Sequence, residues 1–154
     1  MGSLYSKGIK MLIDKIDDKL YLSGSITNYE YLKELGITTV INCKAESHDD
    51  VYELTKMGIA YYWLPIGDNL PPSIVTHYKP FEEIMKKEDK VLCHCNQGAG
   101  RSAALVAMYL IKRYNLSAIE ALDRLGDLRP ISKRMTQMQR DKIFMFYDME
   151  KKNE

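Results

Sequence analysis

The chain of 154 residues is long enough to form one compact domain that folds without a stabilising disulfide or metal ion. Its 22 basic and 21 acidic residues leave a net charge of +1, which gives no electrostatic reason to expect nucleic acid as the main partner. Three cysteines, a small and odd number, favour a reducing compartment over a secreted disulfide framework. We therefore expect a monomer with a single domain over residues 1–154, located in the cytoplasm and also able to enter the nucleus.

The first letters, MGSLYS, match the pattern Met-Gly-x-x-x-Ser of N-myristoylation, which makes Gly2 a candidate acyl acceptor. The same letters also arise by chance or as a remnant of cloning, and one acyl chain alone anchors a protein only marginally. No apolar run in the sequence reaches the length of a membrane span, so we expect no stable insertion into a membrane.

The first half of the chain alternates between short strands and short helices. Asp17 and Asp18 form a turn between the first two predicted strands, and Thr27 or Asn28 is the expected N-cap of the first helix. The β-branched run ITTVINC is typical of a strand buried on both faces. The predicted strands cover residues 11–13, 20–22, 37–43 and 59–66, and the predicted helices cover residues 27–36 and 49–58.

The second half is mostly helical. Ser73 is expected to open its first helix and Pro80 to kink it, whereas the helix from Arg101 is apolar almost all round and should be buried at the centre. The alternation of elements predicts an α/β fold, with a central, mostly parallel sheet of about five strands and helices on both faces. The predicted helices cover residues 73–90, 101–115, 117–128 and 134–152, and the last strand covers residues 90–95.

The stretch VLCHCNQGAGRS joins this last strand to the helix from Arg101. In open α/β sheets, ligands bind beyond the carboxyl ends of the strands, where a loop leads into the next helix. The backbone N–H groups of such a loop form an anion cradle, and glycines allow the main chain to turn tightly and to approach an oxyanion closely. We predict that a substrate phosphate is held here by Asn96, Gln97, Gly98, Ala99, Gly100 and Arg101.

Cys95 lies at the start of this loop and is the predicted nucleophile. A helix N-terminus and a nearby arginine lower the pKa of a thiol, so we expect Cys95 to be a thiolate at neutral pH. Arg101 offers a planar fork that can hold two oxygens of a phosphate at once. The implied reaction is an in-line displacement at phosphorus that forms a cysteinyl-phosphate.

HCNQGAGRS matches the pattern His-Cys-x5-Arg-Ser and resembles the phosphate-binding loop of the cysteine-dependent protein tyrosine phosphatases. Over residues 10–147, through YYWLPIGDNLPPS and GDLRP, the chain resembles the small dual-specificity branch of that superfamily. The resemblance implies phosphorylated proteins or peptides as partners, with phosphotyrosine, phosphoserine or phosphothreonine as the reacting group. No cofactor is implied.

The in-line displacement also requires an acid, because the leaving oxygen must be protonated. Asp68 follows the predicted strand 59–66 and resembles the family's general acid, which later serves as the base that activates water. From its neighbours alone, Asp68 is a turn former. Ser102 has two interpretations that can hold together: it caps the helix, or, as the family suggests, its hydroxyl stabilises the Cys95 thiolate as a leaving group.

Cys93, His94 and Cys95 do not predict a metal site, because three consecutive strand residues cannot all face one ion. His94 should point away from the substrate and hydrogen-bond the loop backbone, and Cys93 should belong to the core. Cys43 ends the strand 37–43 and should reach the same sheet edge as Cys95. Related phosphatases place a second cysteine similarly, which implies a reversible Cys43 to Cys95 disulfide under oxidation; the alternative for Cys43 is a small buried residue.

The substrate class is less sharply defined. A short chain without the N-terminal loop of the classical tyrosine-specific enzymes implies a shallow pocket open to all three phosphorylated residues. KAESHDD and DNLPPS, the expected pocket walls, contain no basic patch, which disfavours phosphoinositides and RNA 5′-phosphates. These remain alternatives, as does a phosphate-binding scaffold with little turnover.

The segment RPISKRMTQMQ follows an Arg-Pro step. Arg129, Lys133 and Arg134 either contact a substrate phosphate or a peptide acid, or form the solvated start of a helix. Gln137 and Gln139 are candidates for positioning water.

Overall fold

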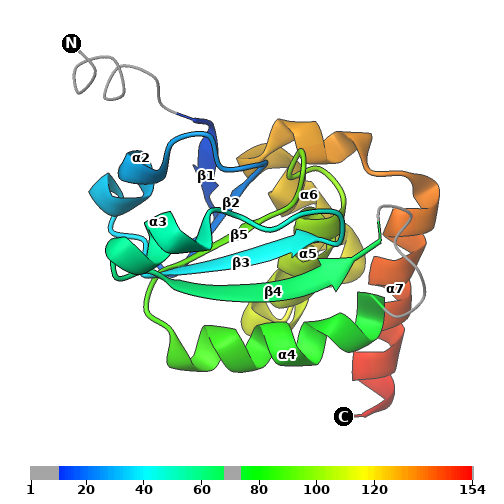
Figure 1. Cartoon of the computed structure of the whole chain (residues 1–154). Helices are drawn as coiled ribbons and strands as arrows, with labels where there is room; N and C mark the ends of the chain where they lie inside the picture. Colours follow the sequence, from blue (N-terminus) through cyan, green and yellow to red (C-terminus); the bar gives the residue numbers. More distant parts are fainter. Residues whose placement is uncertain (1–10, 68–73, 154) are drawn as a thin grey trace.

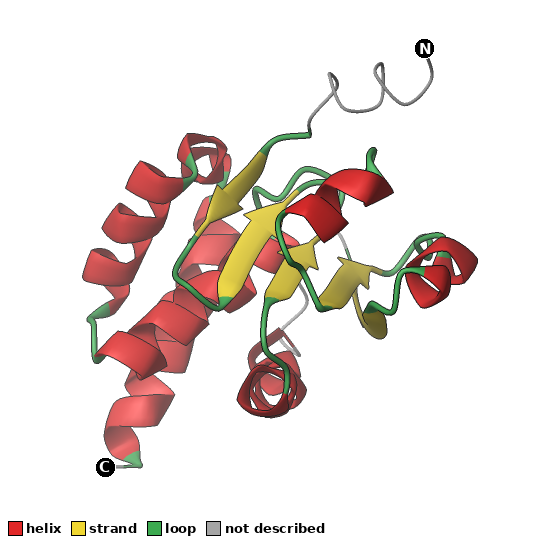
Figure 2. Cartoon of the chain, turned by 90° about the vertical axis from the view of Figure 1, so that its left-hand side faces the viewer, coloured by secondary structure: helices red, strands yellow, loops and turns green. Residues whose placement is uncertain are grey.

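A computed structural model describes residues 11–67 and 74–153. Five strands form one sheet in the order β1-β2-β5-β3-β4, and only the β1–β2 pair is antiparallel (Figures 1 and 2). The mostly parallel sheet predicted from the sequence is thus confirmed. The strands are β1 (Ile13–Lys15), β2 (Leu20–Ser23), β3 (Thr39–Lys44), β4 (Ala60–Ile66) and β5 (Val91–His94).

Helices cover both faces of this sheet, and each face has its own cluster of buried apolar residues. One face carries the short helices α2 (Tyr29–Glu34) and α3 (Val51–Lys56). The other face carries the larger core and four longer helices, among which α5 is central: its first eleven residues, from Arg101 to Ile111, are all buried. These four helices are α4 (Ile74–Lys87), α5 (Arg101–Tyr114), α6 (Ala118–Leu128) and α7 (Gln137–Lys152).

Local sequence signals explain most helix ends. The Asn28 side chain accepts the Tyr31 amide and caps α2, as predicted. Helix α4 continues through Pro80, where a kink was expected. The last helix begins later than predicted: a 3-10 turn, η1 (Pro130–Arg134), comes first, and α7 starts at Gln137, where Thr136 and Gln139 form a reciprocal capping box.

The strand register brings three loops to one edge of the sheet. His94, at the end of β5, lies opposite Ser23 of β2 on one side and Asn42 of β3 on the other. Because these three strands run parallel, the segments that follow Ser23, Lys44 and His94 all leave the sheet at its carboxyl edge. This edge carries the candidate site.

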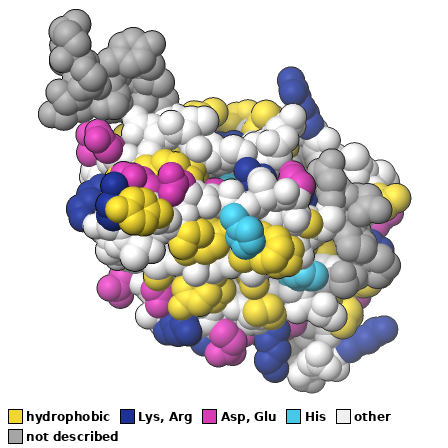
Figure 3. Space-filling model, viewed as in Figure 1, with side chains coloured by type: hydrophobic (Ala, Val, Ile, Leu, Met, Phe, Trp, Pro, Cys, Tyr) yellow, Lys and Arg dark blue, Asp and Glu magenta, His cyan; other side chains and the backbone are white. Residues whose placement is uncertain are grey.

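Hydrophobic side chains gather on the face of the molecule seen in Figure 3. The exposed large hydrophobic residues of α3 and β4 are Val51, Tyr52 and Trp63.

Within the described ranges, none of the helices has the length and apolar character needed to span a membrane.

Candidate active site

The loop from Cys95 to Gly100 connects β5 to α5 and forms the floor of a cavity of about 310 Å³. Three residues from the C-terminal part of the chain, Arg134, Thr136 and Gln139, line the same cavity. The carboxyl end of a parallel strand therefore meets a helix N-terminus here, as the sequence predicts. All six residues expected to hold phosphate belong to this loop or to the first position of α5.

The backbone of the loop is turned by groups that bind its carbonyls from behind. Four consecutive carbonyls are engaged: that of Cys95 by the His94 ring (Nδ1 to O, 3.3 Å), that of Asn96 by the Ser25 amide (3.0 Å), and those of Gln97 and Gly98 by Arg129 (2.8 and 2.9 Å). The N–H and C=O of a trans peptide point in opposite directions. The amides that follow these carbonyls therefore face the cavity, which is the arrangement of an anion-binding nest.

Gly98 is the position at which this turn excludes any other residue. Its φ of +67° lies in the left-handed region. A Cβ at this position would lie 2.5 Å from the Ser23 carbonyl oxygen and 2.7 Å from the Arg129 guanidinium. The close approach of loop, strand β2 and Arg129 is possible only because Gly98 has no side chain.

Cys95 is 3% exposed, and its sulfur accepts two hydrogen bonds, from the Ser102 hydroxyl at 3.1 Å and from the Gly98 amide at 3.3 Å. Burial alone raises the pKa of the Cys95 thiol. Hydrogen bonds from Ser102 and Gly98, together with the positive charge of Arg101, outweigh burial and hold this pKa below its ordinary value. The geometry therefore favours a reactive thiolate, as the sequence predicts.

Ser102 does not cap the helix. The N-cap of α5 is Gly100, which has no side-chain cap, and Ser102 is wholly buried at the second helical position. Its hydroxyl is directed to the Cys95 sulfur instead. Of the two interpretations of Ser102, the capping one is wrong, because the helix begins at Arg101, two residues earlier than capping by Ser102 would require.

Arg101 is also buried, at 3% exposure, and its guanidinium is held by the loop after β3. Its Nη1 and Nη2 donate to the two carboxylate oxygens of Glu46, at 2.6 and 3.0 Å, and Nη1 donates to the Ile66 carbonyl at 3.2 Å. The hydrogen bonds from Arg101 lower the pKa of Glu46 to about 2. Glu46 is half-exposed and was not predicted to have this role.

Arg129 corrects a further expectation. It neither contacts substrate nor forms a solvated helix start, because it is 3% exposed behind the loop. Besides the two loop carbonyls, its guanidinium binds the Asp14 carboxylate at 2.8 Å. Arg129 thereby joins the end of α6 to strand β1 and to the phosphate loop. The Arg-Pro step therefore contributes to this site through the loop backbone, because the Arg129 guanidinium holds two backbone carbonyls of the loop.

The family model for the catalytic domain of dual specificity phosphatases matches residues 20–146. The chain belongs to this family. Dual specificity protein phosphatase 18 of Bos taurus is 30% identical over 125 residues, which represent 77% of this chain and 64% of that protein.

Solved structures share the fold of this chain. The crystal structure of PTPMT1 in complex with PI(5)P has a TM-score of 0.75 at 20% identity, covering 92% of this chain and 97% of that one. The crystal structure of Tk-PTP in the active form has a TM-score of 0.73 at 25% identity, covering 88% of this chain and 96% of that one. The α/β architecture predicted from the sequence is thus also the fold of these two solved structures.

In this dual specificity phosphatase domain, His94 points away from the cavity, as predicted. It is wholly buried, and besides the loop carbonyl it binds the Asp49 carboxylate through Nε2 at 2.6 Å. Asp49 was expected in a pocket wall, and its contact with His94 was not predicted. The available signal was the cluster of acidic residues directly after β3, since β3 pairs with β5 in parallel.

The three cysteines all belong to the larger of the two core clusters, on one face of the sheet. The sulfur that Cys43 contacts is that of Cys93, at 3.8 Å. Both residues are wholly buried, and burial together with the Cys43 contact raises the pKa of Cys93. Cys93 is thus a core thiol, as expected, and all three cysteines are free.

Other predicted residues have different positions. Asp68, the predicted general acid, and Gly2 lie outside the described residues. Gln139 lines the cavity, whereas the Gln137 side chain binds Asp141 along the surface of α7. Of the three cations in the C-terminal segment, Arg134 is the one that lines the cavity, and it is exposed there.

Proposed function

We propose that the protein hydrolyses phosphate monoesters on phosphoproteins through a cysteinyl-phosphate. The Cys95 thiolate attacks phosphorus while Asp68 gives its proton to the leaving ester oxygen. The Asp68 carboxylate then takes a proton from water, whose oxygen attacks the phosphocysteine and releases inorganic phosphate. Cys95 leaves as a thiolate, which the hydrogen bond from Ser102 stabilises.

The observation that carries this proposal is the position of the Cys95 sulfur at the start of a loop whose peptide N–H groups face the cavity. The carbonyls of the same peptides are all held by hydrogen bonds on the opposite side. Such amides stabilise charge on equatorial phosphate oxygens without reorganising during the reaction. Arg101 adds a positive charge at the same loop and is oriented by Glu46 before any substrate arrives. This site combines a thiol, a cation and preoriented amides. A site that only binds phosphate would not need the thiol, so the combination favours displacement at phosphorus.

Protein substrates are favoured over lipids by the charges around the cavity. Glu46, which holds Arg101, and Asp50 are exposed acidic residues of the loop after β3, beside the phosphate loop. A densely anionic inositol phosphate would meet this acidic loop, whereas a single phosphorylated side chain needs only the cradle. The chain spans 64% of the length of dual specificity protein phosphatase 18 of Bos taurus. Membership of the dual specificity phosphatase family also favours a phosphoprotein substrate.

A phosphoinositide phosphatase is the second candidate. PTPMT1, which shares the fold, was crystallised in complex with PI(5)P, and Arg134 provides an exposed cation in the cavity of this chain. Turnover measured side by side on phosphotyrosine, phosphoserine and phosphothreonine peptides, inositol lipids and triphosphate RNA separates the candidates. We expect kcat/KM to be highest for the phosphopeptides; a higher value for an inositol lipid or for RNA would contradict the protein assignment.

The mechanism is tested with an aryl phosphate. Replacement Cys95→Ser should abolish turnover, and residual turnover near the wild-type rate would exclude the cysteinyl-phosphate. Replacement Asp68→Ala should lower kcat roughly 10²- to 10⁴-fold on esters with poor leaving groups, the usual range for a general acid, and much less on aryl phosphates with good leaving groups. Equal losses on both kinds of ester would remove Asp68 from the acid role. A phosphate-binding scaffold would show neither effect, because it would not turn over either substrate.

We also propose that the domain is redox-sensitive through its cysteines. Peroxide would oxidise the Cys95 thiolate to a sulfenic acid, and the Cys43 thiol would displace water from it to form a Cys43 to Cys95 disulfide. Cys43 belongs to the same core cluster as Cys95. Mass mapping after mild peroxide treatment tests this pairing: sulfenic or higher oxides on Cys95 alone, or a bridge to Cys93, would contradict it.

The remaining proposals concern the whole protein. We propose one catalytic domain over residues 1–154, acting as a monomer in the cytoplasm and nucleus. Size-exclusion chromatography with light scattering tests the monomer, and cell fractionation tests the compartments. Incorporation of a myristoyl analogue that is lost with Gly2→Ala would establish acylation of Gly2; no incorporation would exclude it.

A further inference from the structure

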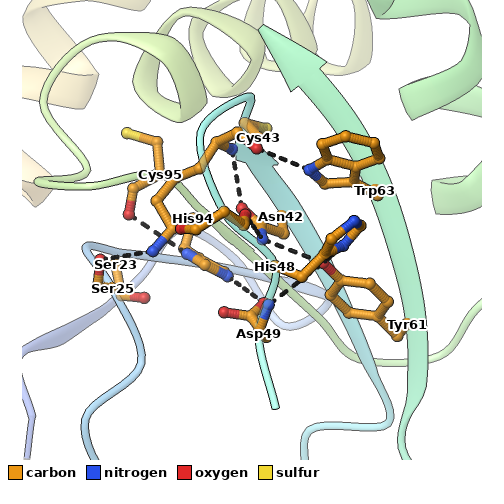
Figure 4. A network of polar contacts seen from close by, with 12 residues as sticks. Ser23, Ser25, Asn42, Cys43, His48, Asp49, Tyr61, Trp63, His94 and Cys95 are labelled. Atoms are coloured by element: carbon orange, nitrogen blue, oxygen red, sulfur yellow. Dashed lines mark hydrogen bonds and ion pairs between the residues drawn. The ribbon is translucent and has the colours of Figure 1, made fainter. Parts of the chain in front are cut away.

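His94 is a wholly buried histidine whose two ring nitrogens both face acceptors. Nδ1 lies 3.3 Å from the Cys95 carbonyl oxygen, and Nε2 lies 2.6 Å from Oδ2 of Asp49, whose side chain is only 4% exposed. Figure 4 shows the ring between the end of β5 and the loop after β3. The nucleophile is the next residue along the chain, so the state of this ring bears directly on the catalytic loop.

The number of protons at this contact follows from the partners. A carbonyl oxygen only accepts hydrogen bonds, and so does an ionised carboxylate, whereas a neutral imidazole carries one N–H. Two hydrogen bonds to two acceptors therefore need one more proton than a neutral His94 and an ionised Asp49 contain. That proton is either on the ring, which gives an imidazolium, or on the Asp49 carboxyl.

The ring is the better place for the proton. An imidazole is a stronger base than a carboxylate, and a charged N–H donor to a carboxylate makes the short contact seen at Nε2. The pair is also enclosed, which strengthens the attraction between opposite charges. The titratable and charged groups nearest to Asp49 are the Tyr61 hydroxyl, which its amide contacts, with Tyr29, His48 and Asp50 around the same loop.

We propose that Asp49 is a positioning residue that keeps His94 doubly protonated, so that a buried imidazolium lies directly behind the catalytic cysteine. The ring then donates to the Cys95 carbonyl, which fixes the first peptide of the loop with its partner amide toward the cavity. The positive end of the His94 and Asp49 pair is also the end nearer to Cys95. This inference deepens the proposed function and rests on it.

Other groups act on Cys95 as well, and the experiment must separate them from Asp49. Arg101 and Ser102 act on it from α5 and Cys93 from β5, and Cys43 of β3 belongs to the same core cluster. Arg134 lies across the cavity and Glu46 holds Arg101 from the side. None of these residues is altered by a substitution at Asp49, which makes Asp49→Asn the informative variant. Asparagine keeps the shape and can donate to or accept from Nε2, but it carries no charge.

The first experiment examines the protonation of His94 in the resting protein by long-range proton–nitrogen NMR. The chain has three histidines, so the His94 signals are assigned by their loss in His94→Gln. Both ring nitrogens of wild-type His94 should be protonated at pH 7, and one should become unprotonated in Asp49→Asn. An unprotonated ring nitrogen in the wild type would overturn the inference, and that measurement requires no variant of Asp49.

The second experiment measures the reactivity of Cys95 as a function of pH, by alkylation with iodoacetamide and by kcat/KM on an aryl phosphate. A cation a few ångströms away lowers the pKa of an acid by about 1–3 pH units, and the Asp49 carboxylate beyond the ring offsets part of this. Loss of the pair should thus move the acidic limb of both profiles upward by about half to one pH unit.

The matched control is Asp50→Asn, which removes the same charge one residue away. Asp50 caps α3 by accepting the Glu53 amide, and asparagine is an equally good cap, so this variant should leave both profiles unchanged. If Asp49→Asn lowers stability with an unshifted acidic limb, or if Asp50→Asn shifts it equally, the positioning role is wrong. Absence of turnover on every phosphate ester would contradict the proposed function instead, and alkylation of Cys95 would still decide this inference.

Discussion

The loop 95–100 after β5 and the loop 45–50 after β3 leave the sheet side by side, because their strands are paired in parallel register. The first supplies the nucleophile and the amides, and its residue types are dictated by backbone geometry. The second supplies two carboxylates, Glu46 against Arg101 and Asp49 against His94. One loop performs the proposed chemistry, and the other holds the groups that perform it.

The two loops also differ in how strongly they constrain the sequence. Gly98 admits no side chain, whereas a carboxylate that binds through one or two hydrogen bonds could come from several positions of a loop. A motif is therefore easy to recognise in the first loop and hard to recognise in the second. Substitutions should follow the same order, with the largest effects in the loop after β5.

The largest effect is expected for Gly98→Ala. A left-handed alanine costs about 1–2 kcal/mol, and the clash with the Ser23 carbonyl adds about 1–3 kcal/mol. Urea unfolding should show this loss of stability, and kcat/KM should fall at least 10²-fold, the cost of a misplaced loop. The control is Gly58→Ala, which has a φ of +72° but no atom within 4 Å of the added carbon. Gly58→Ala should lose only the left-handed cost and keep its activity; equal behaviour of both variants would exclude the steric explanation.

The next largest effect is expected for Arg129→Lys. One ammonium group cannot reproduce three hydrogen bonds to the Gln97 and Gly98 carbonyls and to Asp14. We expect kcat on an aryl phosphate to fall about tenfold to 10²-fold because the amides lose their orientation. Arg134→Lys serves as the control, since Arg134 is exposed in the cavity and should change KM more than kcat. Full activity of Arg129→Lys would show that the loop keeps its shape without this support.

These contacts mark what the sequence could and could not predict. The mostly parallel sheet with helices on both faces and the catalytic loop follow from periodicity, glycines and a recognisable motif, all of which are local. Asp49 and Asp50 are adjacent residues of the same type, yet one pairs with His94 and the other caps α3. Which of them turns inward depends on the packing of β3 against β5, and no local pattern contains that information. The burial of Arg129 could not be predicted for the same reason, because its partner Asp14 lies more than a hundred residues away in the sequence.

A smaller, pH-dependent effect is expected for Ser102→Ala. The Ser102 hydroxyl lowers the pKa of Cys95, so its removal should raise that pKa. Activity needs the thiolate, and the acidic limb of kcat/KM should therefore move to higher pH, by about one pH unit for one charge-assisted hydrogen bond. Ser23→Ala is the matched control, because Ser23 is equally buried and donates to the Gly24 carbonyl instead. A shift of the same size in Ser23→Ala would assign the effect to general loosening of the site.

The smallest effect is expected for Glu46→Gln in the supporting loop. Glu46 is half-exposed, so solvent weakens its attraction for Arg101, and the Ile66 carbonyl still holds the guanidinium. We expect KM for an aryl phosphate to rise about fivefold, which corresponds to about 1 kcal/mol of orientation lost. Because the pKa of Glu46 is about 2, this residue stays ionised above pH 4 and should add no inflection to the wild-type profile near neutrality.

Glu46→Gln also decides between two roles for this carboxylate. If Glu46 orients Arg101 for the phosphate, the glutamine variant binds substrate less well. If it competes with the phosphate for the same guanidinium, the variant binds substrate more tightly, and KM falls. Glu53→Gln, in the adjacent helix α3 and paired with Lys56, controls for the loss of one surface charge. The number of contacts that Glu46 makes with Arg101 favours orientation: it engages Nη1 and Nη2 at the end of the fork, and an arginine has further donors to present to a phosphate.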